Sequence, residues 1–232
     1  MSEPLQAVLF DVAGTLTMPA ERSGWLSRAA AAVGLTLGAD EASALGEELE
    51  AAGRPGGPYP ATVPPELAAA YAGRDLDPAA HRAAYVGLLS TVVLPHPRLA
   101  EALYEDGLDP AGWTAYPDAA PVLASLRARG IRTAAVSNVG FDIRPALAAV
   151  GVLEHLDACV LSYEVGAAKP DPAIFRAACA ALDSPPHATL MVGDHPSADG
   201  GATALGIRTL LLPMSRAGEP HGLDAVLALA TS

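Results

Sequence analysis

The sequence predicts an α/β fold in which helices cover both faces of a parallel sheet, with a small all-helical domain inserted after the first strand. Two observations carry this prediction. Over residues 117–212, short apolar runs alternate with stretches of helical periodicity, an order that gives parallel strands joined by right-handed crossovers. Over residues 20–110, Ala, Leu and Glu dominate instead, and apolar residues recur at helical spacing with few β-branched runs.

The first strand is a short, mostly apolar run over residues 5–10, which ends at Asp11 and is followed by Gly14. This pattern is typical of a buried strand that enters a turn. Helical stretches follow at 24–34, 40–52, 78–93 and 97–105, with a loop rich in Gly and Pro at 53–60. We expect residues 18–113 to form the helical domain, and residues 1–17 with 114–232 to form the α/β core.

The rest of the core is expected to alternate helices with strands. The helices are predicted at 119–129, 142–149, 171–182 and 198–205, and the strands at 131–136, 158–162, 189–192 and 207–212. The result is a Rossmann-like sheet, in which ligands bind beyond the carboxyl ends of the strands.

Composition limits the possible functions. The net charge of −12 makes nucleic acid an unsuitable partner, because an acidic surface repels phosphate backbones. No apolar run reaches the roughly 18 residues of a membrane span, and the first residues lack the basic flank of a signal peptide, so we expect a cytoplasmic protein. Cys159 and Cys179 stand in apolar surroundings and are interpreted as buried reduced thiols.

Polar residues stand where the predicted strands end. Asp11 ends the first strand, Ser137 and Asn138 end the second, and Asp194 ends the fourth. Lys169, the only lysine of the chain, lies in the loop after the third. Taken singly, each of these residues needs no functional explanation, because polar loop residues ordinarily begin where a strand ends. Because one parallel sheet brings all five to a single edge, together they predict a site.

These residue types act as a unit in phosphoryl chemistry. The carboxylate of Asp11 can be a nucleophile that forms an aspartyl-phosphate. Such a carboxylate and a phosphoryl group repel each other unless a hard cation with oxygen ligands lies between them, and Asp11 with Asp194 can hold one. Asp199 can bind the ion directly or through water, and Lys169 adds positive charge. The hydroxyl of Ser137, with backbone N–H groups of Asn138 and of the loop after Asp11, can cradle phosphoryl oxygens.

Four segments, in this order, resemble the motifs of the haloacid dehalogenase (HAD) superfamily. They are Asp11-Val12-Ala13-Gly14-Thr15-Leu16-Thr17, Val136-Ser137-Asn138, Lys169-Pro170-Asp171-Pro172-Ala173-Ile174-Phe175 and Val192-Gly193-Asp194-His195-Pro196-Ser197-Ala198-Asp199. The third and fourth are the specific ones. The insertion at 18–113 stands where this family places a helical cap domain.

The resemblance implies a Mg²⁺-dependent phosphatase that acts on a small phosphorylated metabolite, as a monomer or homodimer. It implies that Asp11, Ser137 and Lys169 are catalytic, that Thr15, Ser137, Asn138 and Lys169 bind substrate, and that Asp11, the carbonyl of Ala13, Asp194 and Asp199 serve the metal.

One residue departs from the family pattern. Where the first motif normally has a second aspartate, this chain has Ala13. In phosphatases of this type that aspartate is the general acid and base, and such a group contributes about 10²–10⁴-fold in rate, or roughly 3–5 kcal/mol of barrier. We therefore expect binding to survive the change better than turnover. Phosphonoacetaldehyde hydrolases also have alanine there, but they use a cap lysine, and this cap has none.

Other interpretations stay open. A catalytically impaired relative that binds Mg²⁺ and a phosphorylated ligand as a sensor or partner is one, although the retained Asp11, Lys169, Asp194 and Asp199 favour an enzyme. Dehalogenation is less favoured, because dehalogenases do not use a magnesium-binding fourth motif. His195 and Thr17 are alternative proton carriers, although a loop histidine more often has a surface or hydrogen-bonding role. Candidate substrate contacts in the cap, otherwise explained as solvated faces or cap core, are Arg22, Trp25, Arg28, Arg54 and Tyr59.

Overall fold

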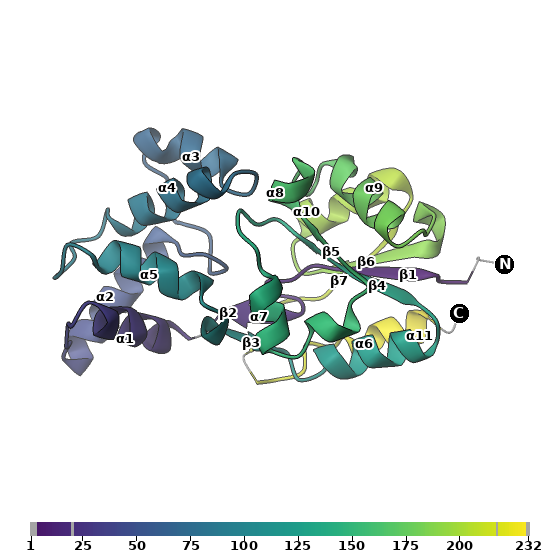
Figure 1. Ribbon diagram of the computed structural model, residues 1–232, viewed down its shortest axis with the longest axis horizontal. Coiled ribbons are helices and arrows are strands. Elements are labelled where there is room, and N and C mark those ends of the chain that lie inside the picture. Colours follow the sequence, from purple (N-terminus) through teal and green to yellow (C-terminus); the bar gives the residue numbers. More distant parts are fainter. Residues whose placement is uncertain (1–3, 20, 217, 231–232) are drawn as a thin grey trace.

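The computed structural model describes residues 4–19, 21–216 and 218–230. Residues 1–3, 20, 217, 231 and 232, which the two predicted domains include, lie outside the described residues. Figure 1 shows an α/β lobe on the right, which holds both chain ends, and a lobe of helices on the left. The α/β class with a parallel sheet is confirmed.

The centre of the α/β lobe is a five-stranded sheet with the order β5-β4-β1-β6-β7, and every neighbouring pair is parallel. The strands are β1 (Ala7–Phe10), β4 (Arg132–Ser137), β5 (Ala158–Leu161), β6 (Thr189–Gly193) and β7 (Arg208–Leu211). In the register, Phe10 of β1 pairs with Ala135 of β4 on one side and with Val192 of β6 on the other. The carboxyl ends of the three central strands therefore lie together.

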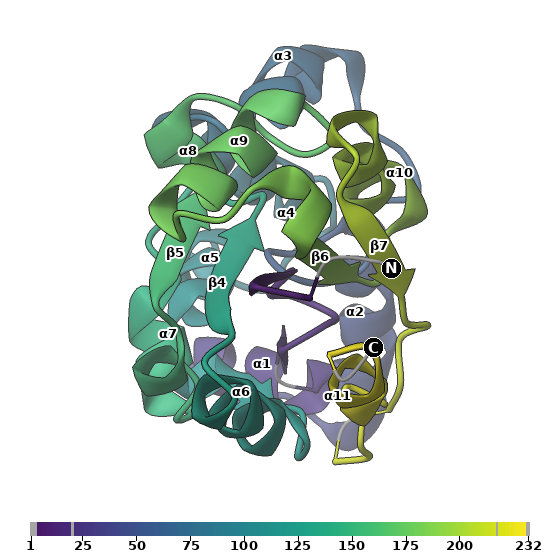
Figure 2. The same cartoon turned by 90° about the vertical axis from the view of Figure 1, so that its right-hand side faces the viewer.

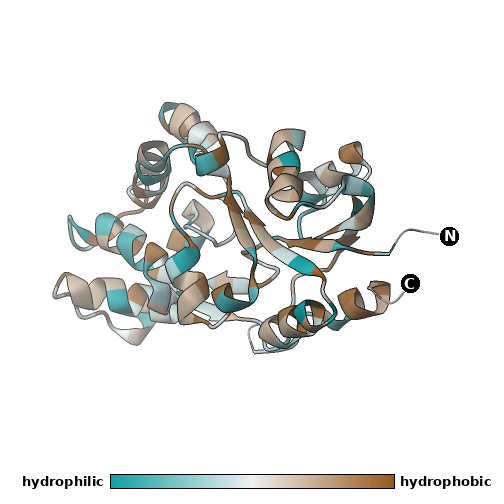
Figure 3. Ribbon diagram, turned by 45° about the vertical axis from the view of Figure 1, so that its right-hand side comes forward, coloured by the Kyte–Doolittle hydropathy of each residue, from teal (hydrophilic) through white to brown (hydrophobic). Residues whose placement is uncertain are grey.

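Helices cover both faces of this sheet (Figure 2). On one face lie α6 (Ala119–Ala128), α7 (Arg144–Ala149) and α11 (Asp224–Leu229), and on the other lie α9 (Pro172–Ala181), α10 (Pro196–Asp199) and the 3-10 helix η5 (Gly200–Leu205). Val8 and Phe10 of β1 join the core under the first face, whereas Ala7 and Leu9 join the core under the second. This alternation with burial on both sides explains why the central strands are mostly apolar (Figure 3).

The helical lobe contains α1 (Arg22–Ala32), α2 (Ala39–Ala52), α3 (Ala68–Gly73), α4 (Pro78–Leu89) and α5 (Leu99–Leu108). It has its own apolar cluster, in which Trp25, Leu49, Leu89 and Leu103 are almost completely buried. Helix α1 packs on α5 and α2. The antiparallel strands β2 (Thr17–Pro19) and β3 (Trp113–Ala115) join the lobe to the core. Residues 21–112 thus build a separate hydrophobic core of their own.

Most predicted elements are present with shifted ends, and several short ones were not predicted. The unpredicted elements are β2, β3, α3, α8 (Ser162–Val165), α11, and the 3-10 helices η1 (Pro65–Leu67), η2 (Pro110–Gly112), η3 (Leu153–His155) and η4 (Pro186–Ala188). The predicted helix over 198–205 is instead the end of α10 followed by η5, where Gly200 and Gly201 weaken the α-helix. Gly201 is also required for packing, since a Cβ there would lie 2.5 Å from Cβ of Pro170.

The structure bears on two expectations from the sequence, the state of the two cysteines and the lack of a membrane-spanning segment. Cys159 and Cys179 are both free thiols, as expected, but Cys159 is only partly buried. Within the described part of the chain, none of the helices is long and apolar enough to cross a bilayer.

Candidate active site

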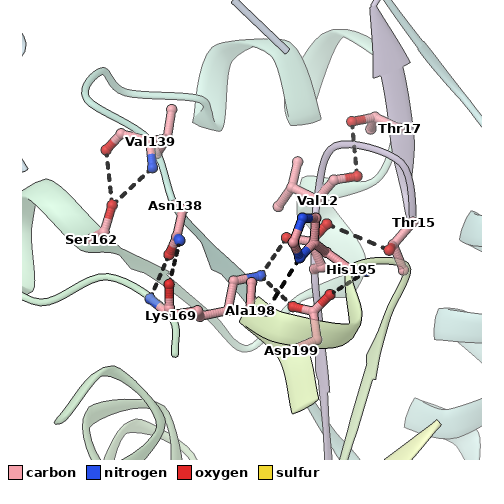
Figure 4. A network of polar contacts seen from close by, with 11 residues as sticks. Val12, Thr15, Thr17, Asn138, Val139, Ser162, Lys169, His195, Ala198 and Asp199 are labelled. Carbon is pink, nitrogen blue, oxygen red and sulfur yellow. Dashed lines mark hydrogen bonds and ion pairs between the residues drawn. The ribbon is translucent and has the colours of Figure 1, made fainter. Parts of the chain in front are cut away.

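Three neighbouring strands and one loop bring the predicted site residues together. Asp11 follows β1, Ser137 ends β4, and Asp194 follows β6, while Lys169 comes from the loop between α8 and α9. Figure 4 shows Lys169 reaching toward Asp199, close to the turn that carries Thr15. The arrangement follows from the parallel topology, because parallel strands release their loops at the same edge.

Lys169 lies between two carboxylates. Its Nζ atom donates to Oδ1 of Asp11 at 2.5 Å and to Oδ1 of Asp199 at 2.7 Å. The side chains of Lys169 and Asp199 are 2% and 0% exposed, so this ion pair is shielded from solvent. Burial opposes the charge of the ammonium, but the two carboxylates outweigh it and raise the pKa of Lys169. Lys169 is therefore a fixed positive charge in the floor of the site.

The main chain at Lys169 is held by the side chain of Asn138. The amide of Asn138 donates to the carbonyl of Lys169 at 2.8 Å, and its Oδ1 accepts from the backbone N–H of Lys169 at 2.7 Å. A carboxamide carries one donor group and one acceptor, so it can bind the C=O and the N–H of the same residue. Asn138, predicted as a substrate contact, thus uses its side chain to position the lysine, a role that sequence reasoning missed.

Asp199 uses both carboxylate oxygens. Oδ1 accepts from Lys169, and Oδ2 accepts from the backbone N–H of His195 at 2.9 Å. Gly193 permits this arrangement, because a Cβ at that position would collide with the carboxylate of Asp199. Since both oxygens already have N–H partners, Asp199 is placed to hold Lys169 and the loop after β6.

Asp194 lies against the turn that follows Asp11. Gly14 has φ of 93°, and a Cβ built on it would lie 2.6 Å from Oδ2 of Asp194. Glycine is therefore required twice, for the left-handed backbone and for the close approach of the carboxylate. The turn itself is closed by the N–H of Gly14, which donates to the carbonyl of Thr17 at 2.7 Å.

Three carboxylates meet at this edge of the sheet. One oxygen each from Asp11, Asp194 and Asp199 lies within 4.8 Å of the others. Burial, together with the charges of Asp199 and Asp194, raises the pKa of Asp11 to about 7, although Lys169 acts in the opposite direction. Burial also raises the pKa of Asp194. Three buried or half-buried carboxylates beside one lysine leave excess negative charge, which suits a divalent cation with oxygen ligands.

The remaining residues of the first two motifs surround Asp11. Thr15 is fully buried, with Oγ1 3.5 Å from Oδ2 of Asp11. Thr17 donates to the carbonyl of Val12 at 3.3 Å and is buried, so it stabilises the turn. Ser137 is buried at the end of β4, and Ala13 is partly buried two residues after Asp11. The backbone N–H groups of residues 14–17 donate within the turn, so a phosphoryl cradle in the loop after Asp11 would use the N–H groups of Val12 and Ala13.

His195 has a structural role in this arrangement. Its Nδ1 accepts from the backbone N–H of Ala198 at 3.2 Å, so His195 is the N-cap of α10. The same Nδ1 lies 3.1 Å from Oγ of Ser197. The ring also meets the ring of Tyr59 edge-on, with centroids 5.6 Å apart. Tyr59 thereby brings the loop after α2 to the mouth of the site.

The other predicted cap contacts have partners within the helical lobe. Trp25 is core and donates from Nε1 to the carbonyl of Leu103 at 2.8 Å. The arginines form ion pairs or stack: Arg22 with Glu50 at 3.2 Å, Arg28 with Asp106 at 2.8 Å, and Arg54 with Glu50 at 3.6 Å and over the Trp25 ring. Arg74 and Asp75, which the sequence did not single out, lie instead against the α/β core. The carbonyl of Asp75 accepts from Ser162, and the carbonyl of Arg74 lies against Gly140.

Comparison with known proteins gives the family of this fold. The model of the haloacid dehalogenase-like hydrolases matches residues 5–204. A phosphoserine phosphatase of Thermus thermophilus is 37% identical over 114 residues, which cover 48% of this chain and 45% of the relative. (S)-2-haloacid dehalogenase 1 of a Pseudomonas species is 37% identical over 125 residues, 53% of this chain and 52% of the relative.

The chain thus spans about half the length of these curated relatives. Among solved structures, one described as a dehalogenase covers 99% of this chain and 98% of its own, with a TM-score of 0.68 and 23% identity. At that identity the likeness shows the fold alone.

Proposed function

The chain belongs to the haloacid dehalogenase-like hydrolases, and from this premise we propose that it is a Mg²⁺-dependent phosphatase for a small phosphorylated metabolite with a good leaving group. The observation that carries the proposal is the position of Lys169 between Asp11 and Asp199, with Asp194 completing the carboxylate cluster. With one ammonium group and three carboxylates, the site has more negative than positive charge. A phosphoryl group bound there would add negative charge, so the site needs a further cation.

The donor set of the site fits Mg²⁺. Asp11, Asp194 and the carbonyl of Ala13 would hold the ion, with Asp199 acting through water because its oxygens already accept hydrogen bonds. Carboxylate and carbonyl oxygens are the ligands that Mg²⁺ prefers. When bound, the ion supplies the charge that lets an anionic nucleophile approach an anionic phosphoryl group.

The reaction proposed for the chain's own residues has two steps. The carboxylate of Asp11 attacks phosphorus, the bond to the leaving oxygen breaks, and that oxygen departs with the electron pair. Water then attacks phosphorus of the aspartyl-phosphate, and the bond between phosphorus and the Asp11 oxygen breaks. This step restores the Asp11 carboxylate and releases inorganic phosphate, which keeps both protons of the water. Lys169, Thr15 and Ser137 hold the phosphoryl oxygens. Because Ala13 has no proton to give, leaving groups that depart unprotonated are favoured in the first step.

The helical lobe, residues 18–113, is proposed to be a cap that closes over the site and excludes water. Its separate apolar core and the contact of Tyr59 with His195 support this role. The dehalogenase remains a second candidate, because a halide needs no proton and Ala13 supplies none.

One set of assays separates the candidates. With Mg²⁺, the wild type should release phosphate from 4-nitrophenyl phosphate, Asp11→Asn should not, and calorimetry should show weaker Mg²⁺ binding by Asp194→Asn. Halide release from 2-chloropropionate without Mg²⁺, and no phosphate release, would assign a dehalogenase instead. Intact Mg²⁺ and phosphate binding with turnover of neither substrate would assign the catalytically impaired binding protein.

A further inference from the structure

The helical lobe makes a second contact with the core, away from the connecting strands, at the loop that follows Ser137. Gly140 of this loop lies beneath the cap, because a Cβ there would collide with the carbonyl oxygen of Arg74 and lie 2.6 Å from Cβ of His81. The next residue, Phe141, places its ring 5.2 Å from the His81 ring. The loop 138–141 therefore meets cap residues 74–81 directly.

Ser162, the first residue of α8, connects the two sides of this contact. Its Oγ donates to the carbonyl of the cap residue Asp75 at 2.5 Å and accepts from the backbone N–H of Val139 at 2.8 Å. A second acceptor, the carbonyl of Val139, lies 3.2 Å away. Ser162 is fully buried. Figure 4 shows Ser162 beside Val139, with Asn138 continuing toward Lys169.

A serine hydroxyl has a single proton, so Ser162 can fully donate to one of these two carbonyls at a time. With the cap seated, the shorter bond goes to Asp75. With the cap displaced, the proton can turn to Val139, so the buried hydroxyl keeps an acceptor in both states. In both states the backbone N–H of Val139 donates to the Ser162 hydroxyl. The hydroxyl itself donates to Asp75 when the cap is seated and to Val139 when the cap is displaced.

The hydrogen bond between Ser162 and Val139 lies next to the residue that positions Lys169. Asn138 precedes Val139 and brackets the backbone of Lys169 with two hydrogen bonds. Ser137, on the other side of Asn138, ends β4. A shift of the loop 138–141 is therefore transmitted to both groups that are proposed to hold phosphoryl oxygens.

We propose that Ser162 is a positioning residue whose hydroxyl couples the seating of cap residues 74–81 to the placement of the Ser137–Lys169 phosphoryl site. The proposal rests on the proposed function in one respect, that this site binds phosphate. By linkage, phosphate should then stabilise the seated cap as much as the seated cap strengthens phosphate binding.

The test is Ser162→Ala, with Ser184→Ala as the matched control. Ser184 is also a buried serine with a hydroxyl partner, Thr189 at 3.0 Å, but its contact lies within the core. Hydrogen exchange of cap segment 74–81 and calorimetry are measured with inorganic phosphate and Mg²⁺. In the wild type and in Ser184→Ala, phosphate should slow exchange over 74–81 by at least about fivefold. In Ser162→Ala this protection should vanish, and phosphate should bind at least about fivefold more weakly than to the wild type.

Equal protection of 74–81 by phosphate in Ser162→Ala and the control would overturn the coupling. If neither the wild type nor any variant binds phosphate, the proposed function is wrong. The coupling through Ser162 is then tested by hydrogen exchange without ligand. Ser162→Ala must then speed exchange over 74–81 as well as at Val139, and a change confined to Val139 would contradict the proposal. Should Ser162→Ala fail to fold, Ser162→Cys, which keeps a weaker donor, is judged by the same criteria.

Discussion

Oδ1 of Asp199 lies 2.7 Å from Nζ of Lys169, and both side chains are almost completely shielded from solvent. Without Asp199, the buried ammonium would face Asp11 alone. The acid at the end of the fourth motif therefore acts on the nucleophile through the lysine.

The first prediction is that Asp199→Asn destabilises the fold and disables the site. Lys169 keeps Asp11 as a partner, but asparagine offers one carbonyl oxygen to the two buried donors that Asp199 binds, Lys169 and the N–H of His195. A buried donor left unsatisfied costs about 1–3 kcal/mol, so urea unfolding should show a loss of that order. The matched control is Asp183→Asn, since Asp183 is 99% exposed and 3.8 Å from Arg132. Its effect should stay within about 0.5 kcal/mol. Equal losses in the two variants would show that Asp199 does not hold the lysine.

The second prediction concerns the turn after the nucleophile. Gly14→Ala should abolish Mg²⁺ binding measured by calorimetry, because its Cβ would occupy the position of the Asp194 carboxylate. Gly34→Ala is the control: Gly34 also has positive φ, 74°, but a Cβ there meets nothing within 4 Å. Both variants carry the strain of a left-handed alanine, of order 1–2 kcal/mol, so only Gly14→Ala should lose the metal. Unchanged Mg²⁺ affinity in Gly14→Ala would remove Asp194 from the site.

The third prediction concerns the stability of the cap at low pH. His81 is 3% exposed, and burial, with the nearby charge of Arg74, lowers its pKa to about 4. Its Nδ1 lies 3.0 Å from the hydroxyl of Tyr104. The folded state therefore keeps His81 neutral while the unfolded chain binds a proton near pH 6.5.

Stability from this histidine is complete above about pH 6.5 and is lost progressively as the pH falls toward about 4. The loss amounts to roughly 3 kcal/mol in that window. His81→Asn, which does not titrate, should flatten the dependence of the free energy of unfolding on pH relative to the wild type. His96→Gln, on a loop, is the control and should keep the wild-type slope. If His81→Asn keeps that slope as well, the acid sensitivity arises elsewhere.

The sequence predicted the elements that long apolar patterns specify. The strands that end at Phe10, Ser137 and Gly193 are buried on both faces, so their apolar runs are unmistakable. The position of Asp11, Ser137 and Asp194 at one edge follows from the parallel order alone. Short elements such as β2 and β3 were missed because three residues carry no periodicity.

Roles that depend on tertiary contacts could not be predicted. The amide of Asn138 holds the main chain of Lys169, 31 residues away, and the hydroxyl of Ser162 meets the cap at Asp75, 87 residues away. No local pattern encodes such pairs. In the cap, Trp25 and Tyr59 were both candidate substrate contacts, with cap core as the alternative for Trp25. The packing separates the two: Trp25 is a core residue and Tyr59 lies beside His195.

The central claim is that Ala13 leaves the site without a general acid and base, and kcat/KM for one alkyl and one aryl phosphate in wild type and Ala13→Asp tests it most directly. Asp11→Asn serves as the blank. The wild type should hydrolyse the aryl ester and barely the alkyl ester, because only the aryl oxygen departs without a proton. Ala13→Asp should raise alkyl hydrolysis by up to about 10²–10⁴-fold. Efficient alkyl hydrolysis by the wild type, with no gain in Ala13→Asp, would contradict the claim and show that another residue transfers the proton.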